Sequence, residues 1–162
     1  MEKFMSFSVG QLQFLDSFQF ASKGLDKLVA TLDDSECKHL RKEFRSDEEF
    51  YLMRQKGIFP YDFLDDIAKL TSEEPIDFPE REVFRNKKES KDCSMKDWLH
   101  GKTVWNAFDC KTFKDYHDLY LKQDVLLLAD FFEKFRSTCH ESYGLDPCHY
   151  FSAPGNSCFL TS

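Results

Sequence analysis

The feature that most constrains this chain is a run of helical periodicity from Thr112 to Phe135. Thr112, with Asp115 three residues later, resembles a capping box that uses Asp in place of Glu, and Gly144 followed by Asp146-Pro147 is typical of a helix end. Apolar and aromatic side chains recur inside this stretch at steps of three and four, which places them on one stripe of an α-helix. We predict that the helix buries this stripe, which consists of Tyr116, Tyr120, Leu127, Leu128, Phe131 and Phe135.

Asp124 falls on the same stripe, between Phe131 and Phe135 on the helical wheel and four residues after Tyr120. Asp118 and Lys122 map to the opposite, solvent-facing side. Carboxylates are rarely buried without a partner, so Asp124 needs an explanation. It could lie at the edge of the stripe and reach water or a buried donor. Alternatively, it could face a metal or phosphate site that Tyr120 also faces, or a groove that binds a partner.

The words around Asp124 resemble a known family. Tyr120 to Val125 has the Y-x-x-x-D pattern of the third exonuclease motif of family B DNA polymerases. The longer words YHDLYLKQDVLLLADFFEKFR and YGLDPCHYFSAPG, together with the lysine-glycine-x-phenylalanine-proline-tyrosine stretch from Lys56 to Tyr61, are similar to protein-primed members of that family. These polymerases belong to viruses, linear plasmids and Maverick/Polinton-type transposons. The resemblance covers most of the chain.

The resemblance implies a helix-rich α/β (α+β) fold, with residues 1–146 forming an incomplete RNase H-like 3′-to-5′ exonuclease domain that has an N-terminal β-hairpin. Residues 71–94 would be a surface connection, and residues 147–162 a truncated link toward the polymerase palm. In the parent enzyme Asp124 would bind Mg²⁺ or Mn²⁺, and Tyr120 would orient the attacking water or the scissile phosphate. Ser17 and Phe18 would approach DNA. The implied partners are the 3′ end of single-stranded DNA and a terminal protein primer.

Hydrolysis of a phosphodiester by two metal ions needs several converging carboxylates. The family supplies an Asp-x-Glu word and a second-motif aspartate, both expected N-terminal to Met1, and palm aspartates expected after Ser162. Only Tyr120 and Asp124 carry over. We therefore expect a fragment of a DNA-directed DNA polymerase that is inactive by itself, with an unpaired sheet edge where the missing strands would sit. The alternative is a catalytically silent module for DNA binding or protein interaction.

The N-terminal half predicts smaller elements. Residues Lys3 to Asp16 alternate in polarity around Gly10-Gln11, which predicts a hairpin, and the Asp-Ser word that follows is also typical of a cap. A short amphipathic helix near Leu25 to Leu32 could lie on that sheet. The polar stretch from Asp33 to Glu49 is predicted to be a solvated surface, including its basic cluster of Lys38, His39, Arg41, Lys42 and Arg45.

Two later segments complete the pattern. Aromatic side chains surround Pro60 between Phe50 and Leu64, and we expect them to anchor a loop into the core, although aromatic residues near lysine can also stack on bases. Met95 to Ala107 is predicted to be a helix that Gly101 interrupts.

Composition limits the class of protein. A chain of 162 residues suits one domain, and it contains neither an apolar run of membrane-spanning length nor a signal-peptide pattern, so we expect an intracellular, soluble protein. The six cysteines are scattered and lack the pairing typical of a zinc site, which predicts reduced thiols. The net charge of −7 disfavours a large nucleic-acid surface, except at an acidic site that holds divalent metal.

Overall fold

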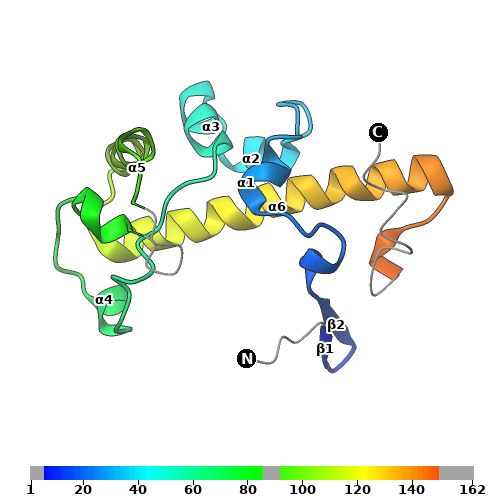
Figure 1. Cartoon of the computed structure of the whole chain (residues 1–162), viewed down its shortest axis with the longest axis horizontal. Helices are drawn as coiled ribbons and strands as arrows, with labels where there is room; N and C mark the ends of the chain where they lie inside the picture. Colours follow the sequence, from blue (N-terminus) through cyan, green and yellow to red (C-terminus); the bar gives the residue numbers. More distant parts are fainter. Residues whose placement is uncertain (1–5, 86–91, 150–162) are drawn as a thin grey trace.

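The chain is organised along one long helix. A computed structural model describes residues 6–85 and 92–149, and α6 (Phe113–Tyr143) runs through nearly the full length of the molecule (Figure 1). The predicted capping box is present, because the Thr112 hydroxyl accepts the Asp115 N–H at 3.2 Å and the Asp115 carboxylate accepts the Thr112 N–H at 2.9 Å. Gly144 ends the helix with φ of 66°, as predicted. The long helix and both of its ends are therefore confirmed.

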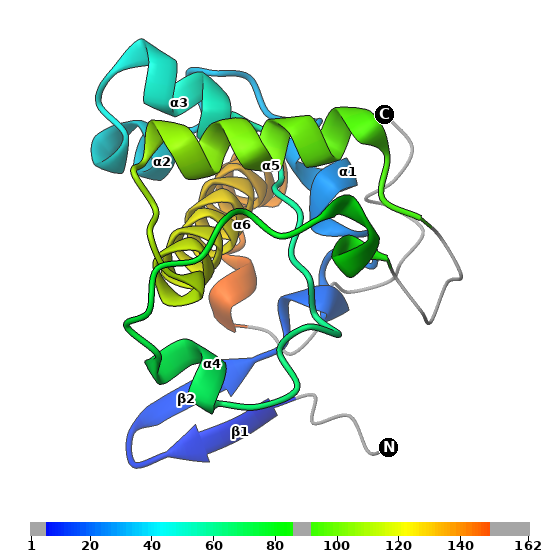
Figure 2. The same ribbon diagram turned by 90° about the vertical axis from the view of Figure 1, so that its left-hand side faces the viewer.

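The remaining elements lie on two sides of α6 (Figures 1 and 2). One side carries α1 (Leu25–Val29), α2 (Lys38–Glu43), α3 (Asp47–Arg54) and α5 (Met95–Ala107). The other side carries α4 (Ala68–Thr71) and the hairpin. The described residues also include three short 3-10 turns: η1 (Ser17–Gln19), η2 (Arg81–Phe84) and η3 (Pro147–His149).

The hairpin consists of β1 (Ser6–Val9) and β2 (Leu12–Leu15), joined at Gly10-Gln11 as predicted. Gly10 has φ of 60°, which suits the first central residue of a type II′ turn. These are the only strands in the part of the chain that the structure describes. The broad α+β class is thus confirmed, whereas a larger RNase H-like sheet stays a prediction. The helix α1 packs on α6 instead of on the sheet, so that expectation was wrong.

One face of the hairpin is apolar and exposed. The register places Phe7 opposite Phe14 and Val9 opposite Leu12, so all four side chains point to the same side. The Phe7 and Phe14 rings stack with centroids 4.7 Å apart. All four residues are exposed in the structure. The outer edges of this two-stranded sheet are unpaired among the described residues.

The polar stretch from Asp33 to Glu49 is more structured than predicted. It contains α2 and the start of α3, and Cys37, Leu40 and Phe44 contribute to the core. These three residues recur at steps of three and four, which is a helical spacing, but their charged neighbours led to the prediction of a solvated surface. The predicted basic face is largely confirmed, because Lys38, His39, Lys42 and Arg45 are exposed, while the Arg41 guanidinium lies 3.8 Å from the centre of the Phe50 ring.

The described residues of the 71–94 segment are mostly exposed, but the part around Phe78 packs on the core. The Phe78 ring contacts the rings of Phe84, Trp98, Trp105 and Tyr116. The Trp98 indole N–H donates to the Pro79 carbonyl at 3.0 Å. The buried contacts of one aromatic residue therefore tie this charged segment to α5 and α6.

Gly101 does not interrupt α5, contrary to the sequence-based expectation. The helix continues through it, and Gly101 is buried where a Cβ atom would stand 3.0 Å from Phe78 Cζ and 3.1 Å from Ile58 Cγ1. The glycine thus permits close packing of two segments against the helix.

The stripe on α6 is confirmed in its centre. Tyr116, Tyr120 and Leu127 are buried, whereas the other three predicted members, Leu128, Phe131 and Phe135, are only half-buried. Asp118 and Lys122 are exposed, as predicted. The buried face also includes two polar side chains that the sequence reading did not single out, Gln123 and Asp130. None of the described helices is both long and apolar enough to span a membrane.

Candidate functional site

Two sequence motifs that carry the resemblance are far apart in sequence but in contact in the structure: the Lys56–Tyr61 segment and the Y-x-x-x-D motif of Tyr120 and Asp124. The Lys56 ammonium donates to the Tyr120 phenol oxygen at 3.1 Å and to Asp124 Oδ2 at 3.3 Å. The phenol oxygens of Tyr61 and Tyr120 lie 2.8 Å apart. We call these four residues the Lys56 cluster. Tyr120 and Asp124 were predicted as site residues from the sequence. Lys56 was not, although it is the first residue of the Lys56–Tyr61 segment that carries part of the resemblance.

The loop after α3 reaches α6 through close packing. Phe59 is buried with its ring centroid 4.9 Å from that of Tyr120, so the predicted anchoring of this loop is confirmed for Phe59, whereas Tyr61 is largely exposed. The Tyr116 hydroxyl donates to the Ile58 carbonyl at 2.7 Å. At Gly57, a Cβ atom would stand 2.7 Å from Gln123 Oε1, so a side chain there would push the loop away from the helix.

Tyr120 is a neutral phenol in this environment. Burial is the main cause that raises its pKa far above the ordinary value, and the hydrogen bond with Tyr61 and the negative charge of Asp124 raise it further. A phenol with so high a pKa cannot serve as a general base near neutral pH. It can donate or accept a hydrogen bond, which suits an orienting role.

Asp124 lies at the edge of the buried stripe, with one carboxylate oxygen paired and the other without a partner among the described residues. Its side chain is 23% exposed and that of its partner Lys56 is 26% exposed, so the ion pair is neither enclosed nor free in solvent. The second oxygen, Oδ1, is buried and has no hydrogen-bond partner among the described residues. An unpaired buried carboxylate oxygen is costly, which marks this atom as an acceptor that a ligand could use.

The cluster by itself does not fit a two-metal site. The described residues contain no group of three or more His, Cys, Asp or Glu side chains that could hold a metal ion. Asp124 is the single carboxylate of the Lys56 cluster, and an ammonium group already neutralises one of its oxygens. Two divalent ions require several oxygen ligands, so Mg²⁺ or Mn²⁺ could bind here only with ligands from outside the described residues.

The cysteines of the described residues are unpaired. Cys37, Cys93, Cys110, Cys139 and Cys148 are free thiols, of which Cys37, Cys110 and Cys139 are buried. Burial raises the pKa of Cys37 and of Cys110 to about 11. These two thiols are therefore weak nucleophiles that belong to the core.

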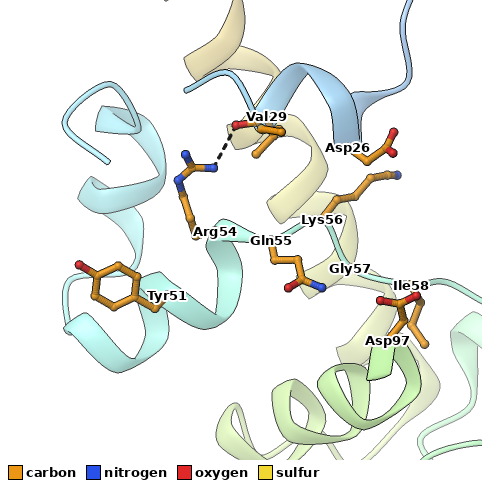
Figure 3. A pocket seen from close by; sticks show the side chains of 10 residues that line it. Asp26, Val29, Tyr51, Arg54, Gln55, Lys56, Gly57, Ile58 and Asp97 are labelled. Carbon is orange, nitrogen blue, oxygen red and sulfur yellow. Dashed lines mark hydrogen bonds between the residues drawn. The ribbon is translucent and has the colours of Figure 1, made fainter. Parts of the chain in front are cut away.

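Lys56 also borders a cleft of about 550 Å³ between α1, the end of α3 and the start of α5. Figure 3 shows Lys56 and Asp26 among the residues that line this cleft, and the Arg54 side chain points toward Val29. The Arg54 guanidinium is occupied by the Val29 carbonyl at 3.2 Å and by the Leu32 carbonyl. Arg54 is thus committed to the fold, whereas Lys56 connects the cleft with Tyr120 and Asp124.

Of the two residues that the resemblance assigns to DNA contact, Ser17 lies at a separate groove and Phe18 is exposed. Asp16 Oδ1 accepts the Phe18 N–H at 3.0 Å, so the Asp-Ser word caps η1. Ser17 lines an apolar groove of about 460 Å³ together with Val125 and Leu128 of α6, and Phe18 is exposed. The structure therefore places Ser17 against the part of α6 that begins directly after Asp124. This groove is a different cavity from the one that Lys56 borders.

A second acidic residue on the buried side of α6, Asp130, was not predicted from the sequence. Its side chain is 1% exposed and accepts hydrogen bonds from the His39 N–H at 2.7 Å, from His39 Nδ1 at 2.8 Å and from the Leu40 N–H at 3.0 Å. These contacts cap the start of α2 from a distant helix. A signal existed, because Tyr116, Tyr120, Gln123, Leu127 and Asp130 follow one helical spacing.

Comparison with protein-family models, with curated proteins and with solved structures found no match. The relation to family B polymerases and the RNase H-like fold are therefore still predictions from the motif words. The predicted link at residues 147–162 lies outside the described residues, apart from η3.

Proposed function

We propose that this chain is part of the 3′-to-5′ exonuclease domain of a protein-primed, DNA-directed DNA polymerase of family B, and that the Lys56 cluster contacts a phosphate of a single-stranded DNA 3′ end. One observation carries the proposal. The Lys56–Tyr61 segment and the Y-x-x-x-D motif are separate parts of the resemblance. Lys56 Nζ nevertheless lies 3.1 Å from the Tyr120 hydroxyl, although the two residues are 64 positions apart in sequence.

The chemistry of the cluster suits a phosphodiester. A lysine ammonium has three donor hydrogens, of which Tyr120 and Asp124 use two, so one remains for a phosphate oxygen. The neutral phenol of Tyr120 can orient a water molecule or the phosphate. Asp124 Oδ2 accepts a hydrogen bond from the Lys56 ammonium and thereby holds it in place. In the intact parent, proofreading would use Mg²⁺ or Mn²⁺, with Asp124 joined by carboxylates that the described residues do not contain, and a terminal protein would prime synthesis.

The charge of the chain limits how DNA would bind. A net charge of −7 disfavours an extended phosphate track, so contact should involve about one phosphate at Lys56. Each phosphate neutralised on a single strand contributes about −0.7 to the slope of log affinity against log salt. We therefore expect weak binding of an oligothymidylate with a slope of about −1 or shallower.

The test is a fluorescence anisotropy titration of a labelled oligothymidylate with wild-type protein, Lys56→Met and Lys122→Met. Both variants remove one positive charge, but Lys122 is exposed on the opposite face of α6. We expect Lys56→Met to weaken binding about tenfold, as removal of a charged contact should, and Lys122→Met to change it less than twofold. Absence of wild-type binding, or an equal loss in both variants, would refute the proposed contact.

A catalytically silent module derived from the same domain is the second candidate, because the described residues lack a metal-holding group. The encoding DNA distinguishes the two. An in-frame Asp-x-Glu word upstream and a palm aspartate motif downstream would indicate an active parent, whereas intervening stop codons would indicate a silent module.

A nuclease assay on single-stranded DNA with Mg²⁺ or Mn²⁺ examines the chain by itself. We expect no cleavage and no metal-dependent change in Tm, since one carboxylate does not assemble a two-metal site. Metal-dependent cleavage that Asp124→Asn abolishes would show that this chain supplies the other ligands itself, contrary to our interpretation.

A further inference from the structure

Gln123 is an amide on the buried face of α6 whose hydrogen-bonding groups all bind the same loop. It is 3% exposed. Its Nε2 donates to the Met53 carbonyl at 2.9 Å and to the Gln55 carbonyl at 2.8 Å, and its Oε1 accepts the Gly57 N–H at 3.1 Å. The amide therefore uses both donor hydrogens and its acceptor on three backbone groups.

These three backbone groups bracket Lys56. Met53 belongs to the last turn of α3, Gln55 is the C-cap of that helix, and Gly57 follows Lys56 directly. The carbonyl groups at a helix end have no partner within the helix, so Gln123 satisfies two of them from another element. The result is that the backbone on both sides of Lys56 is fixed to α6.

We propose that Gln123 is a positioning residue, which holds the Lys56 backbone so that the ammonium group stands between Tyr120 and Asp124. Gln123 immediately precedes Asp124 and lies one turn after Tyr120, so one helix carries the phenol, the carboxylate and the amide that places the lysine. A lysine side chain loses rotamer entropy when it is fixed. When the backbone on both sides of Lys56 is fixed, the ammonium group can reach fewer positions away from Tyr120 and Asp124.

Gly57 supports the same arrangement from the loop side. A Cβ atom at this position would stand 2.7 Å from Gln123 Oε1 and 3.4 Å from the Tyr120 ring. The loop can approach the amide closely only because position 57 has no side chain. A substitution at either partner of this contact should therefore displace Lys56.

The first measurement is the acetylation rate of Lys56 at low conversion, obtained by peptide mass mapping and divided by the rate of the exposed Lys122 in the same molecule. Gln123→Met keeps the approximate side-chain size and removes all three hydrogen bonds. We expect the ratio to rise about fivefold in this variant, because Lys56 would spend more time away from Tyr120 and Asp124. An unchanged ratio in folded Gln123→Met would overturn the proposal.

The matched control is Leu127→Ala, on the same buried face one turn later. Leu127 is fully buried, so its truncation should destabilise the fold by creating a cavity. It does not touch the backbone around Lys56 through a hydrogen bond, so the acetylation ratio should stay at the wild-type value. A rise equal to that of Gln123→Met would assign the effect to lost stability. If Gln123→Met does not fold, Gly57→Ala takes its place, and the same rise is expected.

The second measurement is oligothymidylate binding, and only this part rests on the proposed function. We expect Gln123→Met to weaken binding about as much as Lys56→Met. A raised acetylation ratio without any DNA binding by the wild type would keep the positioning role and refute the proposed function. Wild-type binding that depends on Lys56, with an unchanged acetylation ratio in Gln123→Met, would keep the proposed function and refute the positioning role.

Discussion

Replacing Asp130 by Asn tests whether a carboxylate on α6 holds the start of α2. The substitution keeps the shape of the side chain, so it creates no cavity. It exchanges one acceptor oxygen for an NH₂ group in a place where the His39 N–H, the His39 ring and the Leu40 N–H all donate at 2.7–3.0 Å. At least one donor would then face another donor within a buried site.

The size of the effect follows from these contacts. A hydrogen bond to a charged group contributes about 1.5–3 kcal/mol, and a buried donor left without an acceptor costs about 1–3 kcal/mol. Asp130→Asn retains one acceptor oxygen, so we expect a loss of about 3 kcal/mol in the free energy of unfolding. For a chain of 162 residues this corresponds to a decrease in Tm of about 9 °C.

Urea denaturation at pH 7 measures the loss, with Glu141→Gln as the control. Glu141 is exposed on the same helix and borders the same groove as Asp130, so its substitution should change the stability by less than about 0.5 kcal/mol. Hydrogen exchange should be faster at the His39 and Leu40 amides of Asp130→Asn. A loss below about 1 kcal/mol, or one equal to that of Glu141→Gln, would show that water satisfies these donors.

Two further properties follow from burial. Burial lowers the pKa of His100 below its ordinary value of 6.5, and its Nε2 has no partner among the described residues. The unfolded chain therefore binds the proton first as pH falls, so stability should decrease below about pH 6.5, and His100→Gln should flatten this dependence in urea denaturation between pH 7 and pH 5. An identical slope in the variant would contradict this assignment. Because the pKa of Cys37 and of Cys110 is about 11, iodoacetamide at pH 8 should modify the exposed Cys148 before either of them in peptide maps. Equal rates at Cys37 and Cys148 would contradict the buried position of Cys37.

Elements whose signals are local were predictable from the sequence. The ends of α6 follow from the Thr112 capping box and Gly144, and the hairpin follows from alternation around Gly10. The helix α2 was not predictable in the same way. Its N-terminus has no side-chain cap of its own, and the acceptor for the Leu40 N–H is Asp130, 90 residues later. A helix that is capped from a distant element carries no local start signal.

The candidate site shows the same division. Tyr120 and Asp124 share one turn spacing on a strongly periodic helix, so their proximity could be predicted. The contact with Lys56 depends on how the loop after α3 packs, through buried Phe59 and close approach at Gly57. Helical periodicity contains no information about that distance.

The polar residues of the α6 stripe differ in how fully they are satisfied, and this difference separates structural from functional roles. Gln123 and Asp130 continue the spacing of Tyr116, Tyr120 and Leu127, and each binds three donor or acceptor groups of a segment packed on the helix. Their hydrogen-bonding capacity is used to place the Lys56 loop and α2. Asp124 lies at the edge of this stripe and retains one buried oxygen without a partner among the described residues. Because such an oxygen costs free energy that the other two residues avoid, we propose Asp124, and not Gln123 or Asp130, as the member of the stripe that a ligand would contact.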